Sequence, residues 1–259
     1  MSILCIFFYF ETGILRSVVC LIVSADGTEI ISGSDDCTLR RWSVQTGQCL
    51  QVYEGHSSSV LCAALLPNGN FISGSWDESI KVWDRLTGSC LHTLSEHTDW
   101  IRGITVCSNG DIVSASSDGS LRLWRSGNAP NDPYVTRQVL ANAHSFGASC
   151  VTIVPGTDDL ISGGEDRTVK LWHRAAPTAD YNCVRTFEGH SDGVISVAVM
   201  DNLNIVSGSW DTTVKIWSPS TGECLYTLRG HTDFVHGLAV LPSTEIVSVS
   251  RDKTLKIWN

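Results

Sequence analysis

The chain repeats one pattern, in which two short arms of apolar and β-branched residues flank a polar turn. Residues 204–217 illustrate it: residues 204–209 and 214–217 form the arms, and Trp210-Asp211-Thr212-Thr213 separates them. β-Branched residues favour strands, and Asp and Thr side chains can bond the backbone of a tight turn. Each such stretch therefore predicts two antiparallel strands joined by a turn.

The pattern occurs six times and stays in phase. Each unit ends at a tryptophan: Trp42, Trp83, Trp124, Trp172, Trp217 and Trp258, at intervals of 41, 41, 48, 45 and 41 residues. Every unit has an aspartate six residues before its tryptophan and a serine four residues before that aspartate. Five units also carry a histidine 21 or 22 residues before the aspartate. This repetition predicts one repeat domain over residues 1–259.

A period of about 40–45 residues with Gly-His and Trp-Asp signatures resembles the WD40 family, although the literal pair survives only at Trp83-Asp84. The resemblance implies an all-β propeller of four-stranded blades, with strands a to d running outward from a central channel. Each unit would supply the outer strand d of one blade and strands a to c of the next. Six blades are expected, and a truncated seven-bladed propeller is the alternative.

The first ten residues include an apolar run at residues 3–10. The run is much shorter than the roughly 20 residues of a membrane span, and it lacks the basic region and cleavage site of a signal peptide. Because no strand d follows Trp258 in the sequence, the resemblance predicts that residues 7–10 supply it and close a six-bladed ring.

Serine, histidine and aspartate recurring together could suggest a hydrolase triad, but a single active site would not repeat in every unit with a tryptophan. The resemblance instead implies buried, hydrogen-bonded structural tetrads. The complete sets are His56, Ser73, Asp77 and Trp83; His97, Ser114, Asp118 and Trp124; His144, Ser162, Asp166 and Trp172; His190, Ser207, Asp211 and Trp217; and His231, Ser248, Asp252 and Trp258. The first unit has Leu15 at the histidine position, so Ser32, Asp36 and Trp42 would lack that partner.

Composition narrows the function classes. A formal charge of −9 argues against binding a phosphate backbone, so no nucleic-acid partner is expected, and no membrane association either. The ten cysteines include no Cys-x-x-Cys pair. We expect them to be buried, reduced and not metal-binding, in an intracellular protein of the cytoplasm or nucleus. That expectation covers Cys49, Cys90, Cys183 and Cys224 at one repeat position, and Cys62, Cys107 and Cys150 on another strand. No cofactor or metal is expected.

Three tryptophans fall outside the tetrads: Trp76 and Trp210 precede tetrad aspartates in b–c turns, and Trp100 lies in a d–a loop. The resemblance places both kinds of connection on the top face. Aromatic residues and arginine anchor interfaces, so a partner-binding surface is expected there. Its candidate residues are Trp76, Trp100, Arg102, Trp210, Phe234, His236 and Arg251. Two alternatives are that these aromatics pack only against neighbouring loops, and that the partner binds the c–d insertions around residues 130–134.

The favoured function is a non-catalytic scaffold for a protein or peptide partner. A more specific alternative is a degradation-pathway adaptor or substrate receptor, because residues 73–77 and 248–252 are similar to blades of ubiquitin-binding WD40 adaptors related to phospholipase A-2-activating protein. Ubiquitin is then a possible partner. An enzyme is the third alternative, but the unrepeated His92, His173 and His236 have no accompanying nucleophile motif.

Overall fold

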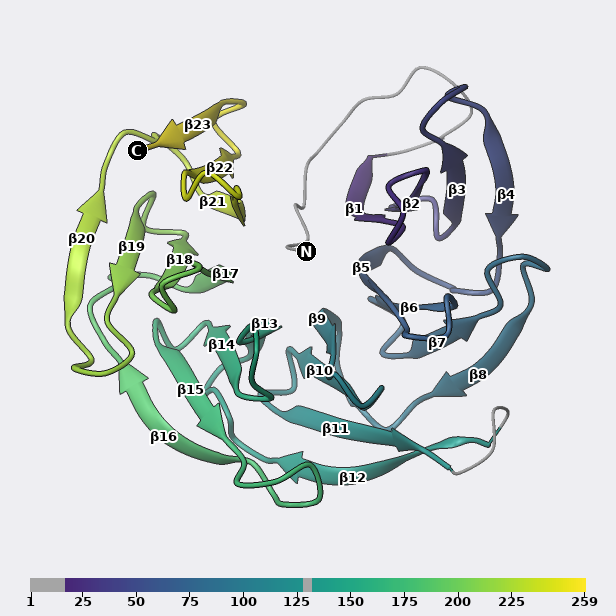
Figure 1. Ribbon diagram of the computed structural model, residues 1–259, viewed down its shortest axis with the longest axis horizontal. Helices are drawn as coiled ribbons and strands as arrows, with labels where there is room; N and C mark the ends of the chain where they lie inside the picture. The colour runs from purple at the N-terminus through teal and green to yellow at the C-terminus, as the bar shows by residue number, and fades with distance from the viewer. Residues whose placement is uncertain (1–16, 128–131) are drawn as a thin grey trace. The chain divides into compact units, whose positions relative to one another are not determined.

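The computed structural model describes residues 17–127 and 132–259, and in these residues it contains strands and turns but no helix. Six antiparallel sheets follow one another along the chain (Figure 1). The first sheet comprises β1 (Val18–Val23), β2 (Glu29–Ser34), β3 (Leu39–Ser43) and β4 (Cys49–Tyr53). The second comprises β5 (Val60–Leu65), β6 (Phe71–Ser75), β7 (Ile80–Trp83) and β8 (Cys90–Leu94). The third comprises β9 (Ile101–Val106), β10 (Ile112–Ser116), β11 (Leu121–Ser126) and β12 (Tyr134–Leu140).

The other three sheets have the same strand order. The fourth comprises β13 (Ala148–Ile153), β14 (Leu160–Gly164), β15 (Val169–His173) and β16 (Asn182–Phe187). The fifth comprises β17 (Val194–Val199), β18 (Ile205–Ser209), β19 (Val214–Trp217) and β20 (Cys224–Leu228). The sixth comprises β21 (Val235–Val240), β22 (Ile246–Ser250) and β23 (Leu255–Trp258). We call the strands of each sheet a, b, c and d in this order.

Antiparallel pairing of consecutive strands gives each sheet two different ends. The d–a loops and the b–c turns lie at one end, which we call the top end. The a–b turns and c–d connections lie at the other, the bottom end. Every predicted top-face residue falls on a connection of the top end or within the first two residues of a strand that starts there.

The chain divides into two compact units. Of the described residues, those up to Asp118 and those between Leu123 and Arg137 form the N-terminal unit, and Gly119–Arg122 with Gln138–Asn259 form the C-terminal unit. The first two sheets lie in the N-terminal unit and the last three in the C-terminal unit, while the third sheet has residues of both.

The b strands form the dry centre of the sheets. All five residues are buried in each of β6, β10, β14 and β18. A Cβ added to Gly74 would come within 2.4 Å of the Ile101 side chain, and one added to Gly208 within 2.8 Å of Val235. The recurrent glycine of the b strand therefore lets strand a of the next sheet approach closely, which a larger residue would prevent.

The expectation that all the cysteines are buried is wrong for four of them. Cys62 and Cys107 are buried and Cys150 is partly buried, whereas Cys49, Cys90, Cys183 and Cys224 are exposed. These four lie at the first or second position of the d strands, which have no further strand outside them in their sheets. An apolar-looking position on an outer strand consequently faces solvent.

Two features of the first unit lie outside the described residues: Leu15 and the segment 7–10 that we predict to close the ring. Within the described residues, the sixth sheet has three strands, and Leu255 and Ile257 of β23 are 52% and 57% exposed. Pairing of residues 7–10 with this sheet stays a prediction. The described part of the chain contains no helix with the length and apolar character of a membrane span.

Candidate functional site

Each complete set of histidine, serine, aspartate and tryptophan is joined by hydrogen bonds. In the second sheet, His56 Nδ1 lies 2.7 Å from Asp77 Oδ2 and His56 Nε2 lies 2.7 Å from Ser73 Oγ. The Trp83 indole N–H donates to the same Ser73 Oγ at 2.8 Å. In the other four sets the same three distances are between 2.7 and 2.9 Å, and the serine that joins histidine to tryptophan is Ser114, Ser162, Ser207 or Ser248.

The order of bonds within a tetrad matches a hydrolase triad, but its surroundings do not. The aspartate can only accept a hydrogen bond, so His56 Nδ1 carries the hydrogen and Nε2 accepts from the Ser73 hydroxyl. Ser73 is 0% exposed, and its oxygen also receives the Trp83 indole N–H. A substrate therefore cannot reach the hydroxyl, and the bonds serve to satisfy polar groups inside the sheet.

The same burial holds for the serines of the other tetrads. Ser114, Ser162, Ser207 and Ser248 are each 0% exposed. Each lies on a b strand, with a c strand paired on one side and an a strand on the other. These serines are consequently structural residues of the sheet interior, and they take no part in a surface site for a substrate or a partner.

Tetrad hydrogen bonds lower the pKa of Asp77, Asp166 and Asp211. Burial by itself raises the pKa of Asp166, but hydrogen bonds from His144 and Thr168 and the charge of His144 lower it to about 2 overall. The pKa of Asp77 and that of Asp211 fall below the usual value in the same way. Burial also lowers the pKa of His144, against the opposing effect of Asp166.

The first sheet retains part of this arrangement. The Trp42 indole N–H donates to Ser32 Oγ at 2.9 Å. Asp36 accepts hydrogen bonds from the backbone and hydroxyl of Thr38, and its carboxylate is 4.0 Å from Arg40. The serine–tryptophan bond is thus present in a unit whose histidine position holds leucine.

In the N-terminal unit, three of the predicted partner-binding residues form a cluster at the top ends of the second and third sheets. The rings of Trp76 and Trp100 stack with centroids 4.7 Å apart and planes 23° apart. The Arg102 guanidinium carbon lies 5.6 Å from the Trp100 ring centroid. Trp76 and Trp100 remain 41% and 39% exposed. We call these three residues the N-terminal aromatic cluster.

The other four predicted residues form a second cluster in the C-terminal unit. The Trp210 and Phe234 rings are 5.9 Å apart, and His236 meets Phe234 edge-on at 6.3 Å. The Arg251 guanidinium carbon lies 5.7 Å from the Phe234 centroid, and its backbone N–H donates to the Phe234 carbonyl. Burial first, and then the charge of Arg251, lower the pKa of His236. We call these four residues the C-terminal aromatic cluster.

The two clusters differ in exposure. Trp210 is only partly exposed, and the space for its ring exists because Gly193 opposite has no side chain: an added Cβ would lie 2.8 Å from the Trp210 ring. Arg251 is exposed. In the C-terminal aromatic cluster the Trp210 ring is therefore packed against the protein and the Arg251 side chain is exposed. In the N-terminal aromatic cluster both tryptophan rings are partly exposed to solvent.

Sequence reasoning missed a further top-end residue, Phe146 in the loop before β13. It is 84% exposed and has a left-handed backbone with φ of 75°, which is costly for a residue with a side chain. In four other sheets a serine at the end of strand b bonds the carbonyl at the position equivalent to Phe146. The fourth sheet has Gly164 there, where a Cβ would lie 2.4 Å from the His144 ring. The replacement of that serine by Gly164 is the feature of the sequence that could have indicated an unusual loop at Phe146.

Within the described parts of the chain, no group of three or more His, Cys, Asp and Glu side chains could hold a metal ion.

The repeat pattern decides the family. The model of the WD domain, G-beta repeat family (WD40), matches residues 11–43, 47–84, 88–125, 136–173, 181–218 and 222–259, which together make up most of the chain. This protein belongs to the WD40 family. The predicted all-β fold is confirmed as a six-bladed propeller with six WD40 repeats, so each sheet described above is one blade.

Individual relatives match shorter stretches of this WD40 protein. Pre-mRNA-processing factor 17 of Saccharomyces cerevisiae is 34% identical over 94 residues, which are 35% of this chain and 20% of that protein. The ribosome biogenesis protein WDR12 homolog of Drosophila erecta is 40% identical over 63 residues, which are 24% of this chain and 15% of that protein. The matched stretches thus span a fifth or less of these relatives.

Among solved structures, the WD40 β-propeller domain of Doa1 is similar, with a TM-score of 0.79 and 24% identity. The match covers 92% of this chain and 77% of the Doa1 chain. At this identity the similarity concerns the fold.

Proposed function

We propose that this WD40 propeller is a non-catalytic scaffold that binds a protein or peptide partner at the top ends of its blades. WD40 propellers are typically protein-interaction scaffolds. The five complete tetrads use their histidines, serines and aspartates in buried hydrogen bonds, which removes the most reactive-looking groups from solvent. The exposed side chains at the top ends include tryptophan and arginine, which suit contact with a protein partner.

The observation that carries this proposal is the N-terminal aromatic cluster. Two stacked tryptophans, each about two-fifths exposed, offer a large apolar area with few rotamers to restrict on binding. The Arg102 guanidinium beside them can pair with a carboxylate of the partner. Tryptophan and arginine are the residue types that most often dominate binding energy at protein interfaces.

Phe146 adds a third element, in the C-terminal unit. An almost fully exposed aromatic ring on a left-handed backbone has no packing role that would offset its conformational cost. A contact with a partner's apolar pocket would supply that offset. The partner we propose therefore presents apolar side chains together with acidic groups.

The experiment compares partners captured by the wild-type protein and by a Trp76→Ala/Trp100→Ala variant, using affinity purification with quantitative mass spectrometry. At least one wild-type partner should fall about tenfold or more in the variant, the scale of an interface hot spot. The matched control is Val44→Ala/Leu86→Ala, which removes two side chains that are 51% and 68% exposed at bottom ends. Unchanged capture by a correctly folded tryptophan variant would contradict the proposal.

Ubiquitin is the second candidate partner. The two segments that resemble ubiquitin-binding adaptors, residues 73–77 and 248–252, contain Trp76 and Arg251 of the two aromatic clusters. Isotope-labelled ubiquitin titrated with the protein should show shifts that weaken about tenfold with Trp76→Ala. Absence of shifts at about 1 mM protein would exclude ubiquitin while leaving the scaffold proposal to the capture experiment.

The relatives suggest an intracellular setting for this scaffold. Two of them are named a pre-mRNA-processing factor and a ribosome biogenesis protein homolog. We propose a cytoplasmic or nuclear location, to be tested by imaging the full chain with a small tag.

A further inference from the structure

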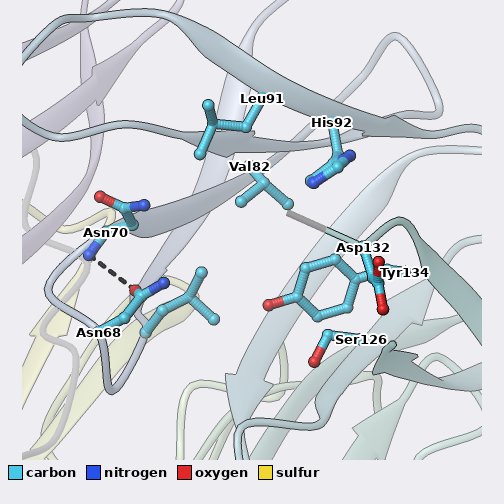
Figure 2. Close-up of a pocket in the computed structure, with 9 residues that line it drawn as sticks. Asn68, Asn70, Val82, Leu91, His92, Ser126, Asp132 and Tyr134 are labelled. Atoms are coloured by element: carbon cyan, nitrogen blue, oxygen red, sulfur yellow. Dashed lines mark hydrogen bonds between the residues drawn. The ribbon is translucent and has the colours of Figure 1, made fainter. Parts of the chain in front are cut away.

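A cavity opens at the bottom ends of the second and third blades, away from both aromatic clusters. It has a volume of about 130 Å³. Asn68 and Asn70 line one side, and His92, Asp132 and Tyr134 lie across from them (Figure 2). Asn68 and Ser126 at its edge are exposed, so the cavity is open to solvent. All of these residues belong to the N-terminal unit.

The fourth blade shows what this place can hold. There Arg174, the second residue after the tetrad tryptophan, is buried with its guanidinium carbon 4.8 Å from the Tyr181 ring centroid. It donates to the Asp158 carboxylate at 2.9 Å and to the Pro177 carbonyl at 3.3 Å. The chain's own arginine thus fills a site made from a tyrosine face, a carboxylate and a carbonyl.

The third blade has a related site without the arginine, and Gly110 stands there at the repeat position of Asp158. Ser126 stands at the repeat position of Arg174, again the second residue after the tetrad tryptophan. Tyr134 stands at the repeat position of Tyr181. Tyr134 precedes Gln138 by four residues, and Tyr181 precedes Arg185 by four residues. Ser126 and Tyr134 both line the cavity, and Asp132 supplies a carboxylate. The cavity therefore lies beside the two repeat positions whose counterparts in the fourth blade, Arg174 and Tyr181, are stacked on each other.

The side chain at a second repeat position, held by His92 in the second blade, also affects the size of the cavity. Gln138 and Arg185 of the third and fourth blades reach the next blade's c–d connection: Gln138 bonds the Tyr181 backbone at 2.8 and 2.9 Å, and Arg185 bonds the carbonyls of Ser220 and Thr221 at 3.1 Å. The second blade has His92 there, which meets the Tyr134 ring edge-on at 6.1 Å. The shorter side chain leaves room between the two blades.

The cavity matches a cationic, planar group in charge and size. Among the described residues that line it, Asp132 is charged and none is lysine or arginine. Oxygens of Asn68, Asn70, Ser126 and Tyr134 add acceptors, and burial raises the pKa of the Tyr134 phenol further above its ordinary value. A water molecule takes about 30 Å³, and cofactor pockets begin near 300 Å³, so this cavity suits one side-chain head.

We propose that the cavity binds the guanidinium group of an arginine side chain from a partner polypeptide. The guanidinium stacks on the Tyr134 ring and donates to the Asp132 carboxylate, as Arg174 does with Tyr181 and Asp158. Val82 and Leu91 provide apolar wall for the methylenes of the arginine. The bottom ends of the second and third blades thus form a second binding surface, independent of the proposed top-end surface.

The test is a titration of the folded full chain with a capped Gly-Gly-Arg-Gly-Gly peptide, followed by nuclear magnetic resonance. Signals of Asn68, Ser126 and Tyr134 should shift together and saturate. The same peptide with citrulline, which has the shape of arginine without its charge, should bind at least about tenfold more weakly. A lysine peptide should also bind more weakly, because it lacks the planar fork.

Two variants separate binding from folding. Ser126→Arg copies the fourth blade, so it should raise Tm and block the peptide by filling the cavity from within. Its matched control is Val44→Arg, which puts the same charge at the same repeat position of the first blade and should leave peptide binding unchanged. Asp132→Asn should weaken the arginine peptide about tenfold.

Three results would overturn the proposal. One is that the arginine peptide causes no shift of the Asn68, Ser126 and Tyr134 signals at concentrations up to about 10 mM, because a dissociation constant above that value would mean no specific contact. Another is equal binding of arginine, citrulline and lysine peptides. The third is a folded Ser126→Arg protein that still binds the arginine peptide as the wild type does.

Discussion

At the scale of single residues, the tetrads turn a sequence pattern into a set of bonds. Ser207 bonds both His190 and Trp217, and Asp211 bonds His190 and Thr213. Trp217 comes ten residues after Ser207 because strands b and c pair directly across a four-residue turn. The spacing in the sequence is thus the geometry of one hairpin, and removing any member leaves buried polar atoms without partners.

Asp211→Ala should lower the free energy of unfolding by about 3 kcal/mol or more, because it strands His190, the Thr213 hydroxyl and the Ser191 amide. Asp36→Ala should cost less, since the first unit has leucine at the histidine position. Urea unfolding of the two variants beside the wild type measures the difference. Equal losses at the two sites would contradict this account of the tetrads.

The tetrad aspartates should make the protein sensitive to acid. The folded pKa values of Asp77, Asp166 and Asp211 lie below the usual 3.8, so each of these three contributes stability that is present above about pH 4 and is lost as pH falls toward the folded value. Urea midpoints measured at pH 6, 4 and 3 should therefore drop steeply between the last two. Asp211→Asn should flatten that drop, and an unchanged slope would count against Asp211 as a source of it.

At the scale of the strand pair, every b–c turn places one residue in the left-handed region. The residues are Cys37, Glu78, Gly119, Arg167, Thr212 and Lys253, with φ between 67° and 83°. Each follows the tetrad aspartate, whose carboxylate holds the turn. Only the third blade has glycine there, so five turns carry a backbone cost that the surrounding hydrogen bonds offset.

Thr212→Gly should stabilise the protein by about 0.5–1 kcal/mol. A β-branched residue is strained at φ of 69°, and relief of this strain in the folded state should outweigh the larger conformational entropy that glycine gives the unfolded chain. Denaturant unfolding measures the gain. The neighbouring Thr213→Gly is the matched control: it removes the hydroxyl bonded to Asp211 and should destabilise. A Thr212→Gly protein less stable than the wild type would show that the turn is not strained.

At the scale of the whole molecule, the last blade has an exposed outer strand among the described residues. Leu255 and Ile257 of β23 are more than half exposed, and an edge strand with apolar side chains invites pairing with another strand. The apolar segment at residues 7–10 is the candidate strand, on the evidence of the sequence pattern. Its pairing with β23 would link the first sequence repeat to the last.

Deleting residues 1–10 should therefore lower Tm and expose β23. Hydrogen exchange read by mass spectrometry should show slow amides in residues 255–258 of the full chain and fast ones in the shortened chain. Peptides from the fifth blade, whose β20 is already the outer strand, serve as the internal control. Equal exchange of residues 255–258 in both chains would contradict closure by the N-terminal segment.

The sequence by itself determined the strands, the turns and the tetrads, because each depends on spacing within one hairpin or between two neighbouring strands. It also placed all seven candidate partner-binding residues in the top-end connections of their sheets or within the first two residues of a strand that starts there. The stacking of Trp76 on Trp100, however, depends on how two consecutive blades approach each other. Periodicity along one blade carries no record of that approach.

Only the tertiary structure decided which positions face solvent and which spaces stay open. The d-strand cysteines are exposed because no strand lies outside them in their sheets, and Phe146 projects because the fourth blade has Gly164 in place of a serine. The cavity beside His92 arises from side chains of two blades, Ser126 and His92, that are both shorter than their counterparts elsewhere. Packing between blades sets these features, and it acts through contacts that a repeat pattern does not encode.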